Sequence, residues 1–546
     1  MKKFLLFLLF LSLSPLYFSQ QFSISFAERN ALISVFNSTS GETWSQKWDF
    51  EKDPKYWYGV KIVNGRVVEL NLRGNALKGN FPATLSALNK LQKLDLSSNQ
   101  LTGDLSPSLS SLSNLVRLDV SNNRLTGDPT AAILPLANLT EISVGNNQFT
   151  FADIDTFLQN FPALKILDLS HIALVSVPQK ISTLTNLESL NLSNNNLSQN
   201  FSNLSTLIKL SELNLSGNQL TKIPTELSSL ISLKTLNLSN NSFSTNYAAT
   251  LSNLKNLEWL SLQNNLITAF PAELVQLKNL VHLNFAENQI SGGFETLLPL
   301  TKLEQIYLDK NLISGAFPSS LLQLKMLQML SLTGNQLSGD IPENIPALTF
   351  LDNNRYTKTD IKNFIVLDKK MADFTYSPQR YDEKKTVFAA LGTAATLPQS
   401  LTGDEYQFTW FKNLGDKTNS TTESYSINTV QEEDYTDYTC EAYYFEKLPT
   451  ELVEISFFRE PVTLSKGLAT SEANYGLVVY PNPTTDFLNI KTHKLDIEKV
   501  FIFDLSGKLI MTENSRKINV KNLPAATYVI SIKTPEGVKS FKFIKH

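Results

Sequence analysis

Cysteine is nearly absent from this sequence, which holds Cys440 alone among its 546 residues. No internal disulfide can form, so an exported form of the chain would have to rely on packing for its stability. Histidine is scarce too, because only His171, His282, His493 and His546 occur. So few imidazoles leave little scope for a metal centre or for acid–base catalysis.

The sequence also lacks an excess of either charge, since its formal net charge is −3. A nearly neutral chain has no electrostatic attraction for nucleic acid or for an anionic membrane, so neither partner is expected. Glycine-rich phosphate loops and zinc-ligand spacings are missing as well. We therefore expect no enzymatic activity, no metal and no cofactor.

A long apolar run occurs only at the N-terminus. A basic start over residues 1–3 precedes the apolar residues 4–11, and smaller residues follow. This order predicts a secretory signal peptide over residues 1–20, cut near residues 19–21. The alternative is a membrane anchor, but the run is shorter than the roughly 18 to 20 residues that a span needs. No cysteine follows the run, so a lipid-anchored N-terminus is not expected.

Beyond that segment, one pattern repeats from about residue 67 to residue 356. In residues 91–99 it reads Leu-Gln-Lys-Leu-Asp-Leu-Ser-Ser-Asn, and it returns about every 23 to 24 residues, or about thirteen times. Ile172 stands where one asparagine is expected, which predicts a local irregularity, and Asn354 lies in a shortened last copy. The framing asparagines are Asn75, Asn99, Asn123, Asn147, Asn195, Asn218, Asn241, Asn265, Asn288, Asn311 and Asn335.

The pattern has a mechanical meaning. Two leucines that are two positions apart point to the same side of a strand, and the asparagine amide can satisfy the backbone of the turn that follows. One copy cannot bury its own leucines, but stacked copies share one core beneath a long parallel sheet. Histidines in copies five apart, His171 and His282, would then be on the order of 24 Å apart and could not share a metal.

These repeats resemble the leucine-rich-repeat family. The resemblance implies an α/β solenoid with a curved parallel β-sheet, which with its C-terminal cap covers residues 65–372. Residues 57–60, Trp-Tyr-Gly-Val, resemble an element in the N-terminal cap of extracellular leucine-rich-repeat proteins, here without the usual cap cysteines. We therefore expect residues 21–64 to cover the open end of the repeat core. Two small all-β sandwich domains are expected to follow the solenoid.

The first of these domains is expected over residues 373–465, where short strand-like segments follow one another. Trp410 lies about 30 residues before Cys440, and residues 434–440 read Asp-Tyr-Thr-Asp-Tyr-Thr-Cys. This arrangement resembles the strand corner of immunoglobulin-like sandwiches. Thr436 replaces the usual glycine, and the partner cysteine is missing. Cys440 is expected to be a buried core thiol, with a nucleophile as the alternative.

The second domain is expected over residues 475–546, after a small polar linker at residues 466–474. It opens with Tyr-Pro-Asn-Pro at residues 480–483, continues with Val-Phe-Ile-Phe-Asp-Leu-Ser-Gly-Lys-Leu at residues 500–509, and ends with Phe-Lys-Phe-Ile-Lys at residues 541–545. These segments resemble the type A C-terminal sorting domain of the type IX secretion system, although Ala526 stands where that family usually has glycine.

The resemblance to a sorting domain has consequences for location and partners. It implies that the export machinery recognises residues 475–546, and that the chain reaches the extracellular space or the outer-membrane surface of a Gram-negative bacterium. No transmembrane span is expected in the mature chain.

One stripe of residues stands out on the exposed face of the predicted sheet. That face presents the positions six, four, two and one before each framing asparagine, and most of them are small and polar. In the later copies, large side chains replace the small ones, and neighbouring copies bring them about 5 Å apart. We call this set the aromatic stripe: Trp259, His282, Gln305, Met329, Tyr307 and Phe350.

Aromatic side chains with polar tips on a rigid face are typical of binding hot spots, so the aromatic stripe is the predicted ligand site. Two other interpretations stay open: the stripe could pack against the following sandwich, or it could lie on a face that binds nothing. The predicted function is therefore non-enzymatic binding, and the family resemblance favours a protein or peptide ligand. The alternatives are an adhesin that grips polysaccharide and a hydrolase with an unrecognised site.

Overall fold

The computed structural model describes residues 22–244, 249–365, 375–448, 452–466, 477–492, 496–505, 507–535 and 537–546. The predicted signal peptide, His493 and residues 467–474 of the predicted linker lie outside these residues. The chain forms two compact units. The first holds the repeats through Leu351, and the second begins at Asp352.

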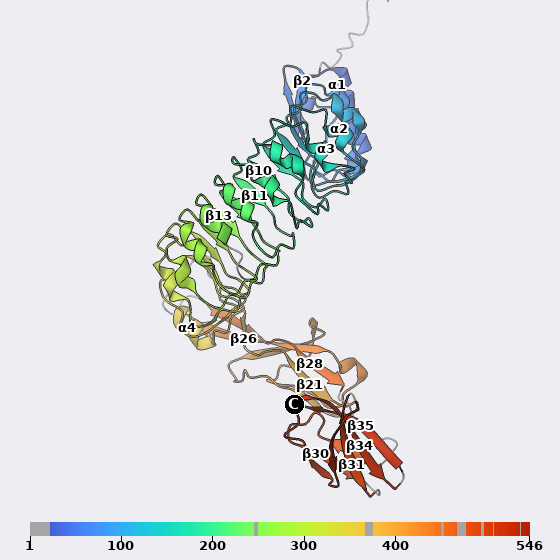
Figure 1. Ribbon diagram of the computed structural model, residues 1–546, viewed down its shortest axis with the longest axis vertical. Helices are drawn as coiled ribbons and strands as arrows, with labels where there is room; N and C mark the ends of the chain where they lie inside the picture. The colour runs from blue at the N-terminus through green and yellow to red at the C-terminus, as the bar shows by residue number, and fades with distance from the viewer. Residues whose placement is uncertain are drawn as a thin grey trace, which may run out of the picture. The chain divides into compact units, whose positions relative to one another are not determined.

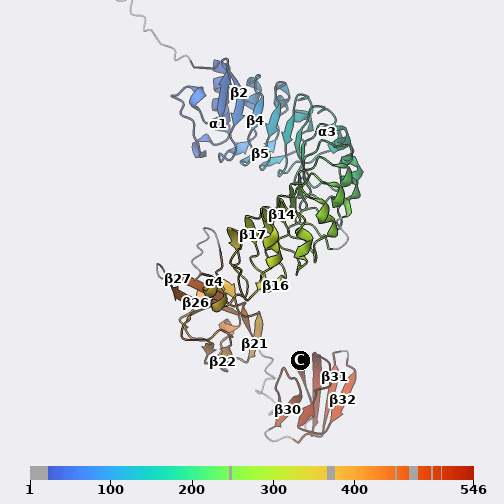
Figure 2. The same cartoon turned by 90° about the vertical axis from the view of Figure 1, so that its left-hand side faces the viewer.

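The first unit is a solenoid built on one 14-stranded sheet, whose strands follow in chain order along a curved array (Figures 1 and 2). Strand β1 (Val60–Val63) pairs antiparallel with β2, and the other thirteen strands are parallel, one for each repeat. This confirms the predicted leucine-rich solenoid. The parallel strands are β2 (Arg66–Asn71), β4 (Lys93–Asp95), β6 (Arg117–Asp119), β8 (Glu141–Ser143), β9 (Ile166–Asp168), β10 (Ser189–Asn191), β11 (Glu212–Asn214), β12 (Thr235–Asn237), β13 (Trp259–Ser261), β14 (His282–Asn284), β15 (Gln305–Tyr307), β17 (Met329–Ser331) and β19 (Leu348–Phe350).

The core of the solenoid lies beneath this sheet. The central residue of each three-residue strand is buried, and it is leucine or isoleucine in every copy except the last. There Thr349 takes the position, and its hydroxyl donates to the Pro346 carbonyl at 2.7 Å, so the buried polar group is satisfied. The alternation of exposed and buried residues leaves the first and third residue of each strand on the concave face.

The convex side of each copy is covered by a short helix or turn. Two small parallel ladders also run there, β3 (Lys78–Asn80) with β5 (Gln100–Asp104) and β7 (Arg124–Thr126), and β16 (Ser314–Gly315) with β18 (Gln336–Leu337). The helical segments are α2 (Thr130–Ile133), α3 (Ile154–Leu158), η3 (Ala83–Ala87), η4 (Pro107–Ser111), η5 (Gln179–Thr183), η6 (Phe201–Leu204), η7 (Thr225–Ser229), η8 (Ala249–Asn253), η9 (Ala272–Gln276), η10 (Phe294–Leu297) and η11 (Ser319–Gln323).

The framing asparagines form hydrogen bonds both to their own turn and to the preceding copy. Asn218 is buried, and its Nδ2 donates to the carbonyls of Leu192, Leu215 and Ser216 at 3.0 to 3.1 Å. Its Oδ1 accepts from the backbone N–H of Leu197 in the preceding copy at 3.1 Å. One side chain therefore bonds to four backbone groups. Among the described residues it is the one partner of the buried Leu197 N–H, whereas each of the three carbonyls has a second donor.

The residue before each framing asparagine is left-handed, with φ between 50° and 72° across the array. Glycine, asparagine and serine hold most of these positions, because they adopt this conformation at low cost. His171 takes it, with φ 53°, in the copy where Ile172 replaces the asparagine. The strand of that copy, β9, keeps a regular register with both neighbours, so the sheet is continuous there.

The N-terminal end of the sheet is closed by an aromatic cap. Helix α1 (Phe26–Ser38) begins after Ser25, whose hydroxyl accepts from the Glu28 N–H at 3.3 Å. Trp48 stacks on Trp57 with ring centroids 4.9 Å apart. Trp44 and Phe36 pack against the same group. Two short helical turns complete this region, η1 (Gly41–Thr43) and η2 (Pro54–Tyr56).

The second unit begins with helix α4 (Lys358–Ile365), which is tied to the β-sheet that follows. Lys358 forms an ion pair with Glu405, and Lys362 forms one with Glu446 at 3.1 Å. The larger sheet contains β20 (Gln379–Arg380), β21 (Lys385–Ala389), β23 (Gln407–Lys412), β24 (Asp416–Lys417), β26 (Asp437–Lys447), β27 (Leu452–Phe458) and β28 (Val462–Lys466). A second sheet pairs β22 (Ala395–Leu397) with β25 (Tyr425–Ile427), and η12 (Glu432–Asp434) precedes β26.

The centre of this domain is a buried tryptophan beside a buried cysteine. Trp410 on β23 is directly opposite Cys440 on β26, and both are fully buried. Tyr438, two residues before Cys440, donates its hydroxyl to the Asp434 carbonyl at 3.1 Å. A tyrosine that closes a corner in this way is a feature of immunoglobulin-type sandwiches. Burial raises the pKa of the Cys440 thiol to about 11, so the group is neutral at physiological pH.

The C-terminal part of the second unit is a sandwich of two antiparallel sheets over one apolar core. Its three-stranded sheet has the order β29–β30–β33, and its four-stranded sheet has the order β32–β31–β34–β35. Tyr528 again anchors a turn, donating its hydroxyl to the Pro524 carbonyl at 3.0 Å. The strands are β29 (Leu477–Tyr480), β30 (Phe487–Thr492), β31 (Lys499–Asp504), β32 (Leu509–Glu513), β33 (Lys517–Asn519), β34 (Ala526–Thr534) and β35 (Gly537–Lys545).

Candidate binding surface

The strand register places the residues of the aromatic stripe side by side on the concave face. The first residues of β13, β14, β15 and β17 are direct neighbours in one row, which runs Trp259, His282, Gln305 and Met329. The third residues form a parallel row, in which Tyr307 and Phe350 flank Ser331. All six side chains of the stripe are half-buried. Within the stripe, Tyr307 donates its hydroxyl to Gln305 Oε1 at 3.0 Å.

The third-residue row has a structural role in the earlier copies that the sequence analysis did not identify. Asn191, Asn214 and Asn237 each accept, through Oδ1, the backbone N–H two residues later, at 3.0 to 3.1 Å. Asp95 and Asp168 accept the same bond at 3.0 and 2.9 Å. These side chains end the strands by forming Asx turns.

Tyr307 and Phe350 break that structural rule. A phenol or phenyl ring at the third position cannot accept the Asx-turn bond as asparagine and aspartate do. The fold therefore does not account for aromatic side chains at these two positions. A position that departs from the structural pattern of its row is a candidate for selection by a ligand.

The structure shows a groove beside the aromatic stripe. This concave groove has a volume of about 560 Å³, and it is lined by outward residues of β10 to β14 together with Glu258. Trp259 and His282 belong to both the groove and the stripe, whereas the other four stripe residues lie outside it. The sequence analysis did not assign the other lining side chains to the ligand site. All the polar ones except Glu258 lie six or four positions before a framing asparagine. These polar side chains are Ser189, Asn191, Glu212, Asn214, Thr235, Asn237 and Glu258.

The floor of the concave groove presents amide donors in a fixed orientation. Because Oδ1 of Asn191, Asn214 and Asn237 already accepts a backbone N–H, the Nδ2 end of each amide is the end left for a ligand. In the described part of the chain these three Nδ2 groups donate to no protein atom. Neighbouring strands place them about 4.8 Å apart, as a ladder of three donors.

The carboxylates around the groove differ in their pairing. Glu258 forms an ion pair with Lys234 at 2.9 Å. Glu212 is exposed and accepts a hydrogen bond from the Ser189 hydroxyl at 3.0 Å. Within the described ranges, Glu212 has no cationic partner. The groove therefore carries one uncompensated negative charge on its wall.

The concave face of the first copies has a different electrostatic character. Arg117 lies between Asp95 at 3.6 Å and Glu141 at 3.3 Å. Burial raises the pKa of Asp119 and of Asp168 above the ordinary value. Asp95, Asp119 and Asp168 each accept the backbone N–H two residues later. These aspartates therefore stabilise the turns that follow their strands.

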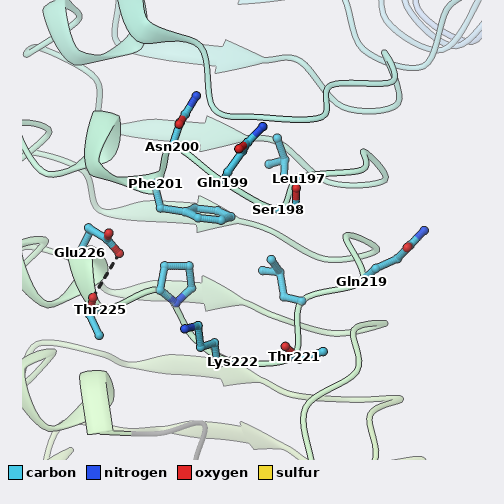
Figure 3. Close-up of a pocket in the computed structure, with 12 residues that line it drawn as sticks. Leu197, Ser198, Gln199, Asn200, Phe201, Gln219, Thr221, Lys222, Thr225 and Glu226 are labelled. Atoms are coloured by element: carbon cyan, nitrogen blue, oxygen red, sulfur yellow. Dashed lines mark hydrogen bonds between the residues drawn. The ribbon is translucent and has the colours of Figure 1, made fainter.

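A second cavity, of about 340 Å³, lies between two successive copies on the side of the turns (Figure 3). Phe201 points into it from one copy, and Lys222 lies across from it on the next. Thr225 donates a hydrogen bond to Glu226 at its rim, at 3.3 Å. The cavity falls where the convex ladders of short strands are not formed, so it is a packing gap between copies.

In the described residues, no three histidine, cysteine, aspartate or glutamate side chains are grouped so that they could hold a metal ion. His282 contributes to the wall of the concave groove, and His171 lies five repeats away, at a left-handed turn.

Comparison with known proteins agrees with this architecture. Residues 65–125, 137–197, 208–267 and 232–290 match the leucine rich repeat family, residues 326–348 match a second leucine rich repeat model, and residues 478–546 match the secretion system C-terminal sorting domain. The chain is therefore a leucine-rich-repeat protein. Its C-terminal residues carry the sorting domain of a secretion system. No curated protein matches the sequence.

Solved structures with the same repeats come from bacteria and plants. The chain is 26% identical to an internalin from Listeria monocytogenes, over 58% of this chain and 92% of that one, with a TM-score of 0.47. It is 31% identical to a leucine-rich-repeat protein from Leptospira interrogans, over 55% and 83%, with a TM-score of 0.46. It is 25% identical to the ectodomain of the Arabidopsis receptor kinase HAESA in complex with a peptide hormone, over 66% of each chain, with a TM-score of 0.51.

The sorting domain indicates export to the cell surface or beyond. The described part of the chain has no helix with the length and apolar character that crossing a membrane requires.

Proposed function

We propose that this is an exported, non-enzymatic binding protein that recognises a protein or peptide ligand on the concave face of its repeats. The observation that carries the proposal is the continuity of the aromatic stripe with the concave groove on one rigid sheet. Large aromatic groups held in a fixed row lose little conformational entropy on binding. The HAESA ectodomain, which has a similar fold, is in complex with a peptide.

The remaining domains complete the proposal. Residues 373–465 form an immunoglobulin-like sandwich, supported by the Trp410–Cys440 pair and the tyrosine corner at Tyr438. This domain spaces the solenoid from the sorting domain or adds a second contact. The sorting domain engages the type IX export machinery, and the protein then acts outside a Gram-negative cell, either attached or released.

The test removes the aromatic groups of the stripe without disturbing the sheet. Trp259→Ala with Tyr307→Ala is expected to weaken binding to cell-surface proteins at least about tenfold, because hot-spot truncations cost more than about 1 kcal/mol each. Binding is measured by surface plasmon resonance with fractionated surface proteins. Tyr56→Ala is the control, since Tyr56 is 71% exposed in the N-terminal cap, away from the concave face.

Unchanged binding by a folded double variant would place the recognition surface elsewhere. A protein that binds glycans but no protein or peptide would instead be a polysaccharide-gripping adhesin.

A further inference from the structure

The concave groove contains a slot that is complementary to a single cationic side chain. In the first-residue row, Thr235 on β12 lies between Glu212 on β11 and Trp259 on β13, and the strand register makes these three direct neighbours. Threonine is shorter than both residues that flank it. A gap about two strand spacings wide, on the order of 10 Å from backbone to backbone, therefore opens above Thr235.

The two walls of this Thr235 slot favour a positive charge. Glu212 supplies an exposed carboxylate. One of its oxygens accepts the Ser189 hydroxyl on the β10 side, and the carboxylate pairs with no cation among the described residues. Trp259 supplies an indole ring, and cations bind to tryptophan better than to other aromatic side chains. The other carboxylate of the groove, Glu258, is already neutralised by Lys234. The uncompensated charge of the groove is thus on β11, at one side of the slot.

The groove floor adds a preference for a ligand backbone. The Nδ2 groups of Asn191, Asn214 and Asn237 lie beside the slot in the neighbouring row, and each is turned outward by its Asx-turn bond. Such amides donate well to peptide carbonyls, which are acceptors without a charge. A free anion is disfavoured at the same place, because Glu212 would repel it.

We infer that the concave groove binds an extended peptide segment whose lysine or arginine side chain enters the Thr235 slot, between Glu212 and Trp259. The asparagine ladder donates hydrogen bonds to the backbone carbonyls of that segment. This inference rests on the proposed function and narrows its ligand to a peptide with a basic anchor residue. The carboxylate of Glu212 distinguishes the slot from the aromatic stripe, which contains no acidic side chain.

The experiment uses the full-length protein on an array of short peptides that are matched in sequence except at one position. That position carries lysine, arginine, norleucine or glutamate. Peptides with lysine or arginine are expected to bind roughly tenfold tighter than their norleucine counterparts, a ratio that corresponds to about 1.4 kcal/mol. The preference should shrink as salt is raised, because the slot is open to solvent.

Two variants test the slot directly. Glu212→Gln removes the charge with little change of shape, so it should abolish the preference for basic peptides and leave norleucine peptides unaffected. Thr235→Arg places a cation of the protein's own in the slot and should exclude basic peptides altogether. Glu69→Gln is the matched control, because Glu69 occupies the same row on β2, far from the groove. Circular dichroism verifies that each variant is folded.

The outcomes separate this inference from the proposed function. Peptides that bind equally whatever the residue at the tested position, or a preference that survives Glu212→Gln, overturn the basic anchor but leave peptide binding intact. Binding to a glycan array and to no peptide overturns both. Failure to bind any peptide on the array, together with no protein partner at the cell surface, also overturns both.

Discussion

Asparagine has two distinct roles in the repeats of this protein. A framing asparagine such as Asn218 serves four backbone groups in two copies. A third-row asparagine such as Asn214 ends a strand and also exposes an amide to the concave groove. At the framing position, asparagine therefore has a structural role, and both ends of its amide are bonded. At the third strand position, its Oδ1 is bonded to the turn, whereas its Nδ2 is left for a ligand.

The framing asparagines make a prediction about stability. Asn218→Ala leaves the buried Leu197 N–H without its partner and should lower the free energy of unfolding of the solenoid by about 1 to 3 kcal/mol, the cost of one unsatisfied buried group. Ile172→Asn installs an amide where the array lacks one and should raise that free energy by about 1 kcal/mol. Urea denaturation followed by tryptophan fluorescence measures both. A destabilised Ile172→Asn protein would show that this copy has repacked around isoleucine.

The half-buried Asp168 predicts a dependence of stability on pH. Burial holds the pKa of Asp168 above the ordinary value of 3.8, so the folded state favours the protonated form. The stabilisation from that proton is complete below the unfolded pKa and is lost as the pH rises through the folded pKa. At neutral pH the buried charge therefore weakens the fold. Asp168→Asn keeps the acceptor for the Ser170 N–H, as Asn191 does for Ser193 in the next copy.

Asp168→Asn should consequently raise the melting temperature at neutral pH, and the gain should disappear in acid. Calorimetric scans across that range measure the difference. Asp168→Ala, which removes the acceptor, is the comparison and should lose about 1 kcal/mol. Equal melting temperatures for wild type and Asp168→Asn at every pH would contradict a shifted carboxyl.

At the scale of elements, most strands of the solenoid have three residues and are too short to form by themselves. Three residues such as Leu213 and its two neighbours form a strand because strands on both sides hold them in register. The β-domain that follows is built differently, around Trp410 and Cys440 on paired central strands. Its stability depends on long antiparallel pairings within one domain rather than on nearest-neighbour copies.

The sandwich predicts the reactivity of Cys440. The thiol is fully buried, so a reagent cannot reach it in the folded protein. Its pKa is raised to about 11, so the reactive thiolate form is scarce at neutral pH. A thiol reagent should label Cys440 only after denaturation, with one equivalent per chain. Tyr438→Phe removes the corner hydrogen bond to the Asp434 carbonyl and should speed the labelling in mild denaturant. Rapid labelling of the native protein would contradict a core position for this residue.

At the scale of the whole molecule, recognition and delivery are carried by different parts of the chain. The repeats provide the concave face, and residues 478–546 match the sorting domain. Because the sorting sandwich has its own apolar core, its removal should leave the solenoid folded. We expect a chain cut at residue 475 to accumulate inside the producing cell, whereas the full chain reaches the surface or the medium.

Mass spectrometry of the surface, medium and cell fractions measures this difference and identifies both termini of the mature chain. A truncated chain that is exported as efficiently as the full one would show that the address lies elsewhere. A point variant, Trp259→Ala, serves as the control, since it should alter ligand binding and leave export unchanged.

The sequence by itself determined the solenoid, the number of copies and the inward leucines, because the repeat forces every copy into the same local geometry. It also placed the aromatic stripe in two parallel rows, since residues at the same position of successive copies become neighbours on adjacent strands. Only the tertiary structure decided that Asn191, Asn214 and Asn237 are fixed by Asx turns and that a groove opens beside Trp259. The depth of a groove depends on the relative heights of side chains from several copies, such as Thr235 between Glu212 and Trp259. No single repeat contains that information.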